Sequence, residues 1–471
     1  MSTLHSEAAR RFNQNREKTT WHDNTFWSVR QKRDAMAHGL PEWEQLRERA
    51  SQIKRHTITH LADYLEQFSA QLESRGVIVH WAKDAAAFND TVLAILQEHG
   101  VRKMVKSKSM LTEECGMNAF LQDNGIDVVE TDLGERILQL LGQKPSHIVM
   151  PAIHLKREEV GRMFEEKGIS RETGNYDPTY LTACARQHLR NQFMEAGAGM
   201  TGCNFGVAAS GDVVVCTNEG NADMSTSMPR LHLVAMGIEK IVPDYQSLAV
   251  FQRLLCRSAT GQPTTSYTSH FRQARPGGEM HVILVDNGRS DILADEEHWE
   301  TLKCIRCGSC MNTCPVYRRS GGYSYTYFIP GPIGINLGML RDARRYSDNV
   351  SACTLCLSCD KVCPVEVNPG SQVYLWRQRL DSLHRADPMK KAMSEGMEVL
   401  FEHPLLYTSV LRLAPFANIV PEKLTHIRAL NPWSVGHDMP EFAKHSFQNL
   451  WKKGKVGMTE VSKCNEENDK E

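Results

Sequence analysis

The chain has 471 residues, of which 41% are hydrophobic and 24% are charged. This length is typical of about three domains, and this composition excludes disordered and fibrous proteins. The 55 Lys and Arg residues nearly equal the 56 Asp and Glu residues, so the charge balance gives no reason to expect nucleic-acid binding. The first residues lack an apolar stretch and no apolar run reaches the roughly 18 residues of a membrane-spanning helix, so we expect a cytoplasmic protein without a signal peptide.

Residues 1–50 form the first predicted segment. They are polar, with basic residues interspersed with Trp21, Trp27 and Trp43. We expect helices that pack onto the domain that follows, and a docking arm for a partner subunit is the alternative.

Residues 51–298 are predicted to form an α/β domain. Short apolar runs at 77–81, 103–107, 126–130 and 148–150 alternate with helical stretches at 53–74, 85–99 and 112–124. Strands that recur at such spacing, with helices between them, are typical of βαβ units and a parallel sheet. Further strands are expected on both sides of the Ser-Gly-Asp turn at 210–212, within 233–242 and at 280–286, with helices over 171–200 and 245–257.

Cysteine is the most informative residue type. Eight of the 14 cysteines fall between residues 304 and 363, in two runs that repeat after 49 residues. Each run reads C-x2-C-x2-C-x3-C-P, the pattern that binds [4Fe–4S] clusters in bacterial ferredoxins. The first run is Cys304, Cys307, Cys310 and Cys314, and the second is Cys353, Cys356, Cys359 and Cys363.

The spacing within each run predicts how the ligands are shared. Three cysteines at steps of three can each take one iron corner, and the fourth points away and ligates the other cluster. Cluster 1 would then use Cys304, Cys307, Cys310 and Cys363, and cluster 2 would use Cys353, Cys356, Cys359 and Cys314. Structural zinc is the competing interpretation, but it typically uses two C-x2-C pairs rather than three close cysteines and a fourth before Pro. Two adjacent clusters favour electron transfer.

Weaker signals lie in the α/β region. Residues 197–202 match G-x-G-x-x-G, but a helical stretch precedes them, so we expect a flexible turn rather than a dinucleotide site. Lys106 and Lys108 follow one strand, and Asn218 and Glu219 follow another, so these four side chains could line one ligand crevice. Ordinary turn and capping chemistry is the alternative. Cys203 and Cys216 are expected to be buried thiols rather than ligands.

The remaining residues divide into a predicted cluster domain at 299–385 and a helical region at 386–471 that ends in a polar tail. Within the cluster domain, residues 323–338 are rich in Gly, Pro and aromatic residues and are expected to form an ordered loop. Residues 403–420 are apolar and amphipathic. They are expected to pack in a core or to face a partner, and attachment at the inner face of the membrane is the alternative.

The chain resembles the lactate utilisation protein B family of iron–sulfur subunits. The resemblance covers nearly the whole length after the first 40 or so residues. The stretches that carry it, besides both cysteine runs, are Val105–Met110 with Thr112–Glu114, Glu130–Gly134, Thr201–Gly206, Thr217–Ala222, Val285–Ser290 and Tyr327–Gly334.

The resemblance implies an α/β domain similar to sugar isomerases and CoA-transferases, then an α-helical ferredoxin-type domain with two [4Fe–4S] clusters, then a helical C-terminal region. It also implies a role as the electron-transfer subunit of a complex that oxidises L-lactate to pyruvate and allows growth on lactate. The implied partners are a second iron–sulfur subunit with cysteine-rich repeats and a smaller lactate-utilisation subunit. The eight cysteines match the family's cluster ligands, but no substrate residues carry over.

Three alternatives to this role stay open. The chain could be an assembly scaffold with structural clusters, or a carrier for the oxidation of another organic acid. It could also be an enzyme that binds an organic anion near Lys106, Lys108 and Glu219. No flavin or nicotinamide fingerprint supports lactate oxidation by this chain alone.

Overall fold

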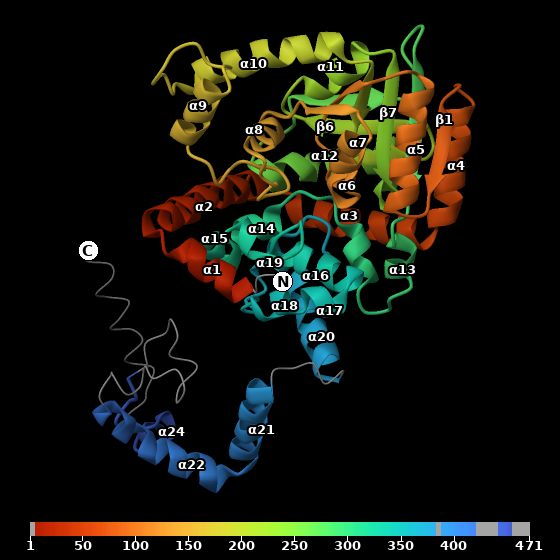
Figure 1. Ribbon diagram of the computed structural model, residues 1–471. Helices are drawn as coiled ribbons and strands as arrows, with labels where there is room; N and C mark the ends of the chain where they lie inside the picture. The colour runs from red at the N-terminus through yellow and green to blue at the C-terminus, as the bar shows by residue number, and fades with distance from the viewer. Residues whose placement is uncertain (1–4, 383–387, 421–440, 455–471) are drawn as a thin grey trace. The chain divides into compact units, whose positions relative to one another are not determined.

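A six-stranded parallel sheet forms the centre of the α/β domain (Figure 1). The computed structural model describes residues 5–382, 388–420 and 441–454. The strand order of the six-stranded sheet is β1-β10-β7-β4-β2-β3, and every neighbouring pair of strands is parallel. The strands are β1 (Ile78–Ala82), β2 (Lys103–Lys106), β3 (Asp127–Glu130), β4 (Ala198–Thr201), β7 (Leu231–Gly237) and β10 (Glu279–Val285).

Both faces of this sheet are covered, so its central strands are buried throughout. Alternate side chains of β7 and β10 enter two separate apolar clusters, because successive residues of a strand point to opposite faces. Helices α5 (Ala85–Glu98), α6 (Met110–Glu114) and α7 (Met117–Asp123) contribute to one cluster. Helix α4 (Leu61–Glu73) and a second sheet contribute to the other. The parallel α/β sheet expected from the sequence is confirmed.

The second sheet has the order β8-β5-β6-β9. Its strands are β5 (Phe205–Val207), β6 (Asp212–Thr217), β8 (Ile241–Val242) and β9 (Tyr267–Phe271). Strands β5 and β6 pair antiparallel around the predicted Ser-Gly-Asp turn, where Gly211 adopts a φ of +68° that favours glycine. Strand β9 was not expected from the sequence, since its exposed polar residues give no apolar run.

Several local expectations were wrong. Residues 148–150 form turns and bends rather than a strand, and the helix expected over 112–124 is divided into α6 and α7 at Gly116. Residues 198–201 form the buried strand β4 instead of a flexible turn. The loop expected over 323–338 contains the 3-10 turn η3 (Gly322–Ser324) and most of helix α16 (Gly331–Arg341). The break at Gly116 reflects its left-handed φ of +64°, which glycine favours, whereas tertiary packing makes residues 198–201 a central strand.

The N-terminal helices form as expected and contact α12 (Tyr245–Thr260) of the α/β domain, but they also pack against the cysteine region, which was not expected. Helix α2 contacts α14 and α15, and α3 contacts the 3-10 turn η2 that leads into the first cysteine run. The N-terminal helices are α1 (His5–Asn13), α2 (Arg16–His38) and α3 (Trp43–Thr59). The cysteine region comprises η2 (Trp299–Lys303), α14 (Ser309–Thr313), α15 (Pro315–Ser320), η3, α16, α17 (Ala343–Tyr346), α18 (Asp348–Ser351), α19 (Ser358–Val362) and α20 (Pro369–Ser382).

The remaining helices of the α/β region connect its strands. They are α8 (Leu133–Leu141), α9 (Arg157–Glu166), α10 (Pro178–Glu195), α11 (Asn221–Ser227), η1 (Ile238–Lys240), α12 (Tyr245–Thr260) and α13 (Arg289–Leu293). The chain divides into two compact units between Arg379 and Leu380. The domain boundaries at residues 50, 298 and 385 stay predictions.

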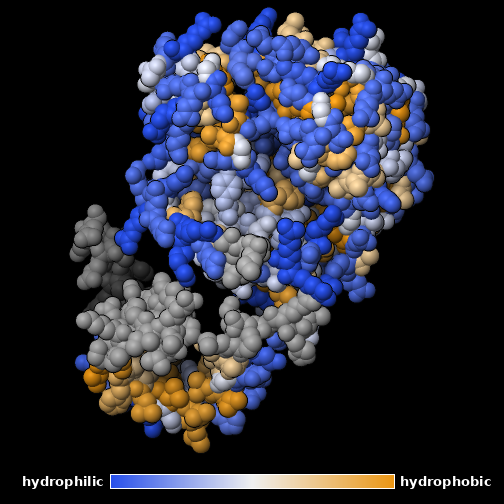
Figure 2. Space-filling model, in the orientation of Figure 1, coloured by the Kyte–Doolittle hydropathy of each residue, from blue (hydrophilic) through white to orange (hydrophobic). Residues whose placement is uncertain are grey.

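The second unit consists of α21 (Pro388–Glu402), α22 (Pro404–Leu413), η4 (Ala414–Ile419) and α24 (Phe447–Lys452). Helix α22 and η4 expose large apolar side chains, including Leu405 at 87% and Ile419 at 76% exposure, which form an apolar surface in Figure 2. The core packing expected for residues 403–420 is therefore not seen among the residues that the structure describes. Among those same residues, no helix is both long enough and apolar enough to span a membrane.

Candidate metal centre

The two cysteine loops repeat the same backbone conformation. Arg306 and Gly308, with φ values of 59° and 77°, lie between the first three cysteines of the first run. Leu355 and Leu357, at the equivalent positions of the second run, have φ values of 54° and 55°. Two left-handed residues at matching positions coil each loop tightly around its three thiols. The helices that follow, α14 and α19, pack against each other.

Thiols from both runs gather in a first group. Burial raises the pKa of the Cys310 thiol well above its ordinary value, and the nearby Cys304, Cys307 and Cys363 thiols raise it further. Cys363 also helps burial to raise the pKa of Cys307 to about 12. Such mutual effects require short distances, because like charges disfavour ionisation only when they are close. The last cysteine of the second run therefore lies beside the first three of the first run.

A second group forms in the reciprocal way. Burial raises the pKa of Cys314 to about 11, and Cys353 and Cys356 contribute to that shift. The pKa of Cys359 is raised by burial, by Asp360 and by the thiols of Cys310 and Cys314. Because Cys359 interacts with a member of each group, the two groups are neighbours. Four converging thiols fit a [4Fe–4S] cluster, since bound iron holds each sulfur as a thiolate and removes the repulsion among them.

Backbone amides donate hydrogen bonds to sulfur in both runs. The amides of Arg306 and Leu355 reach the Sγ atoms of Cys304 and Cys353 at 3.4 and 3.3 Å. The last cysteine of each run also accepts an amide, from Tyr317 to Cys314 at 3.5 Å and from Val367 to Cys363 at 3.3 Å. Hydrogen bonds to cluster sulfurs are among the features that set a cluster's reduction potential.

Three arginines of the N-terminal helices bind the cysteine region. Arg33 donates to the Val362 carbonyl at 3.0 Å, and Arg47 donates to the Cys363 carbonyl at 2.9 Å. Arg30 donates to the Thr313 side chain. The basic character of this segment was visible in the sequence, but no local pattern could indicate that these side chains reach the cysteine loops.

A cavity of about 350 Å³ lies between the α/β domain and the first cysteine loop. Three of the four residues predicted to line a crevice do line this cavity, namely Lys108, Asn218 and Glu219. The first cysteine loop contributes Arg306 and Cys307 to its wall. Lys106 is the exception. It is 1% exposed, and its Nζ lies 2.7 Å from Glu130 and 3.0 Å from Glu113, so it forms a buried ion-pair network instead of lining the cavity.

Cys203 and Cys216 also line this cavity. Burial raises the pKa of each thiol to about 12, so both stay protonated at neutral pH. A protonated thiol has low reactivity, but both side chains are only half-buried, so the expectation that they are buried rather than ligating stays a prediction.

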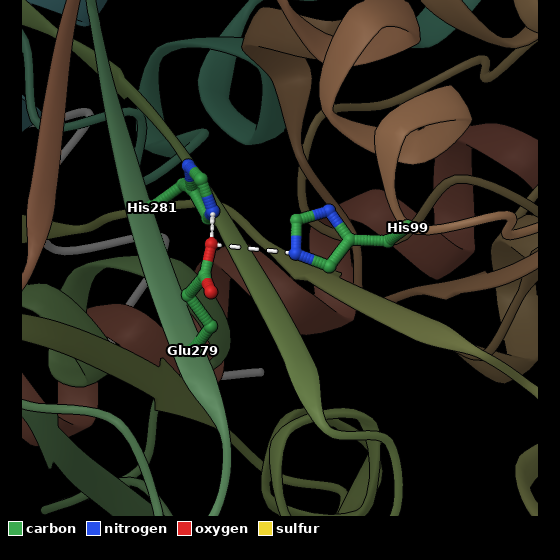
Figure 3. A group of neighbouring side chains, drawn as sticks. All are labelled: His99, Glu279 and His281. Atoms are coloured by element: carbon green, nitrogen blue, oxygen red, sulfur yellow. Dashed lines mark hydrogen bonds and ion pairs between the residues drawn. The ribbon is translucent and has the colours of Figure 1, made fainter.

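A group of two histidines and a glutamate lies at the amino ends of the parallel strands (Figure 3). The Glu279 carboxylate is 2.6 Å from His281 Nε2 and 3.4 Å from His99 Nε2. The other ring nitrogen of His281 lies 2.9 Å from His80 Nε2. These hydrogen bonds account for the arrangement, which sits at the end of the sheet opposite the loops that line the cavity.

Comparisons with known proteins agree with this architecture. A LUD domain model matches residues 65–291, and a 4Fe-4S dicluster domain model matches residues 300–367. The resident cofactors are therefore [4Fe–4S] clusters, and a dicluster domain accommodates two of them. A solved structure of a DUF162 family protein from Deinococcus radiodurans is 14% identical, with 48% of this chain and 98% of that chain covered. Its TM-score is 0.27.

Curated relatives match along most of the chain. An uncharacterized electron transport protein, YkgF, of Escherichia coli (strain K12) is 39% identical over 89% of this chain and 90% of its own length. Lactate utilization protein B of Exiguobacterium sp. (strain ATCC BAA-1283 / AT1b) is 39% identical over 88% of this chain and 90% of its own length. The same protein of Oceanobacillus iheyensis is 38% identical over 90% of both chains. The chain belongs to the lactate utilization protein B family.

Proposed function

We propose that this chain carries electrons in lactate utilisation, as the iron–sulfur subunit of a complex that oxidises L-lactate to pyruvate. The observation that carries the proposal is the pair of adjacent four-cysteine groups, in which Cys359 interacts with members of both. When bound, a [4Fe–4S] cluster accepts and donates one electron at a time. The names of the relatives, an electron transport protein and lactate utilization protein B, point to the same role.

The proximity of the thiols to one another supports two ligand sets. Cys304, Cys307, Cys310 and Cys363 would hold cluster 1, and Cys353, Cys356, Cys359 and Cys314 would hold cluster 2. Cys307, Cys359 and Cys363 are buried, which shields their sulfurs from water, and backbone amides stabilise the thiolate charge of Cys304 and Cys353. The left-handed residues within each loop hold the three close thiols in place.

The proposed partners are a second iron–sulfur subunit with cysteine-rich repeats and a smaller lactate-utilisation subunit. Lactate oxidation releases two electrons, whereas each cluster accepts one, so two neighbouring clusters suit a relay between a lactate-oxidising site and a later acceptor. The family name of the relatives supports a role in lactate utilisation.

The test is anaerobic EPR on the protein purified with its co-purifying subunits. A reduced-cluster signal is expected when L-lactate is added. Cys307→Ser and Cys356→Ser should each abolish lactate-dependent electron flow, whereas Cys184→Ser, outside both runs, should not. Wild-type lactate turnover in both cluster variants would contradict the proposal. Clusters that dithionite reduces and lactate does not, in the complete assembly, would instead indicate a scaffold with structural clusters.

A further inference from the structure

The cavity beside the first cysteine loop has the position of a ligand site. Residues 107–111 reach it from the carboxyl end of β2, and Gly202 and Gly237 reach it from the ends of β4 and β7. Ligands of open α/β sheets bind at the carboxyl ends of the strands. Arg306, Cys307 and Ile329 of the cysteine region close another part of its wall. Its volume of about 350 Å³ is in the range of small-molecule sites.

The cavity wall carries positive charge that no carboxylate pairs with. Lys108, Lys240 and Arg306 line the cavity, and none forms an ion pair with a residue that the structure describes. The Lys108 ammonium donates to the Val149 carbonyl at 2.6 Å. One buried terminal nitrogen of Arg306, Nη1, has no hydrogen-bond partner among the described residues. An unpaired guanidinium nitrogen is costly to bury, so an anion that accepts from it would stabilise this wall.

The carboxylates that line the cavity have other partners, and Asp132 among them accepts the backbone amide of Glu135 at 3.0 Å. Arg289 pairs with Glu239 at 2.6 Å and with Glu114 at 3.0 Å. Glu219 accepts the backbone amide of Leu133 at 3.2 Å. Burial and the Asp132 carboxylate raise the pKa of Glu219 to about 7, so part of the population is protonated at neutral pH and can donate to an anion. The Asn218 and Asn221 side chains add neutral donors and acceptors.

We propose that this cavity binds a small organic carboxylate, held by Lys108 of the α/β domain and Arg306 of the first cysteine loop. The bound anion would lie against Cys307, one of the ligands proposed for cluster 1. A negative charge there stabilises the oxidised cluster and lowers its potential. The location beside a cluster rests on the proposed function, but binding of the carboxylate does not require electron transfer.

The experiment is anaerobic calorimetric titration of the cluster-loaded protein with L-lactate, pyruvate and inorganic phosphate, each used separately. Saturable binding of L-lactate or pyruvate is expected, weakened at least about tenfold in Lys108→Met and in Arg306→Leu. Arg306→Leu introduces the residue that the second loop carries at its equivalent left-handed position, Leu355, so the loop should tolerate it. Iron content checks that both variants keep their clusters. Lys103→Met, at the other end of β2 and paired with Glu195, is the matched control.

A second readout is the EPR spectrum of the dithionite-reduced protein. Saturating carboxylate should shift one of the two cluster signals in the wild type and in Lys103→Met, but not in Lys108→Met. Three results would overturn the proposal: no saturable carboxylate binding, carboxylate binding in both cavity variants as tight as in the wild type, or phosphate that binds as tightly as the carboxylates. Binding without lactate-driven reduction in the complete complex would sustain the cavity assignment while contradicting the proposed electron transfer.

Discussion

Arg47 of helix α3 donates a hydrogen bond of 2.9 Å to the backbone carbonyl of Cys363, which lies 316 residues later in the chain. Its Nη2 also donates to the Asp360 carbonyl at 3.4 Å. The N-terminal helices therefore hold the end of the second cysteine run, and that run supplies the fourth thiol of the first group. Stability of the cysteine region should depend on a residue far outside it.

Arg47→Met should accelerate iron loss. Removal of the charged donor leaves two backbone carbonyls of the cysteine region without this partner, at a cost of about 1.5–3 kcal/mol. The measurement is iron retained per protein during anaerobic incubation with a chelator. Arg49→Met, an exposed residue of the same helix, is the control and should behave like the wild type. Equal iron retention in the two variants would show that Arg47 does not support the loop.

The proposed sharing of ligands between the two runs predicts which cysteine variants resemble each other. Cys363→Ser should alter the same EPR signal as Cys307→Ser, although the two residues belong to different runs. Cys314→Ser should likewise resemble Cys356→Ser, because Cys314 interacts with Cys353 and Cys356. Spectra of the four dithionite-reduced variants test this. If Cys363→Ser instead resembled Cys356→Ser, each run would serve its own cluster.

Gly199 occupies a position in β4 that excludes any side chain. A Cβ atom there would lie 1.6 Å from the backbone carbonyl oxygen of Ser225 in α11. Gly199→Ala should therefore lower the free energy of unfolding by about 3 kcal/mol or more, measured by urea denaturation. Gly197→Ala is the matched comparison. Its Cβ would meet only the Val101 side chain, at 3.1 Å, which can shift, so a small effect is expected. Equal losses of unfolding free energy in the two variants would mean that α11 can move away from residue 199 at little cost.

Lys106 is expected to matter for stability rather than for binding. Lys106→Met leaves the buried Glu130 carboxylate without its ion-pair partner, at a cost of about 3–5 kcal/mol. Lys103→Met, which removes a more exposed pair on the same strand, should cost less than about 1 kcal/mol. The double variant Lys106→Met with Glu130→Gln should recover part of the loss. Thermal unfolding measures the stability of all three variants. If Lys106→Met lost as little stability as Lys103→Met, the buried ion pair of Lys106 would not stabilise the fold.

Stability should fall as the pH rises towards neutrality because of Glu219. Its pKa is about 7 in the folded protein against an ordinary value of 4.5, so the folded state keeps a proton that the unfolded state has lost. The stabilisation from this carboxyl is complete below about pH 4.5 and disappears as the pH passes 7. Glu219→Gln should flatten this slope in anaerobic urea titrations between about pH 5.5 and 7.5, whereas Glu66→Gln, on the surface, should leave it unchanged. If the free energy of unfolding of Glu219→Gln still falls with pH as in the wild type, another titratable group causes the pH dependence.

Regular spacing made the local elements predictable. The two cysteine runs follow from residue order alone, because steps of three and a following Pro define each loop. The strands β1, β2, β3 and β10 were visible as short apolar runs between helical stretches. Strand β10 is buried along nearly its whole length because both faces of the parallel sheet are covered, which makes its apolar run strong, whereas the edge strands β1 and β3 keep polar or exposed residues.

Only the tertiary structure decided which distant residues meet. Residues 198–201 resemble a glycine-rich turn, yet they form a central strand because α11 approaches the bare Gly199 backbone. Lys106 ends strand β2 and Lys108 follows two residues later, but Lys106 is buried in an ion-pair network and Lys108 lines the cavity. Spacing along the chain fixes which side chains share a strand or loop. Packing between elements decides which groups are buried or paired, and it brings Arg306 of the cysteine loop and Lys108 of the α/β domain to the same cavity.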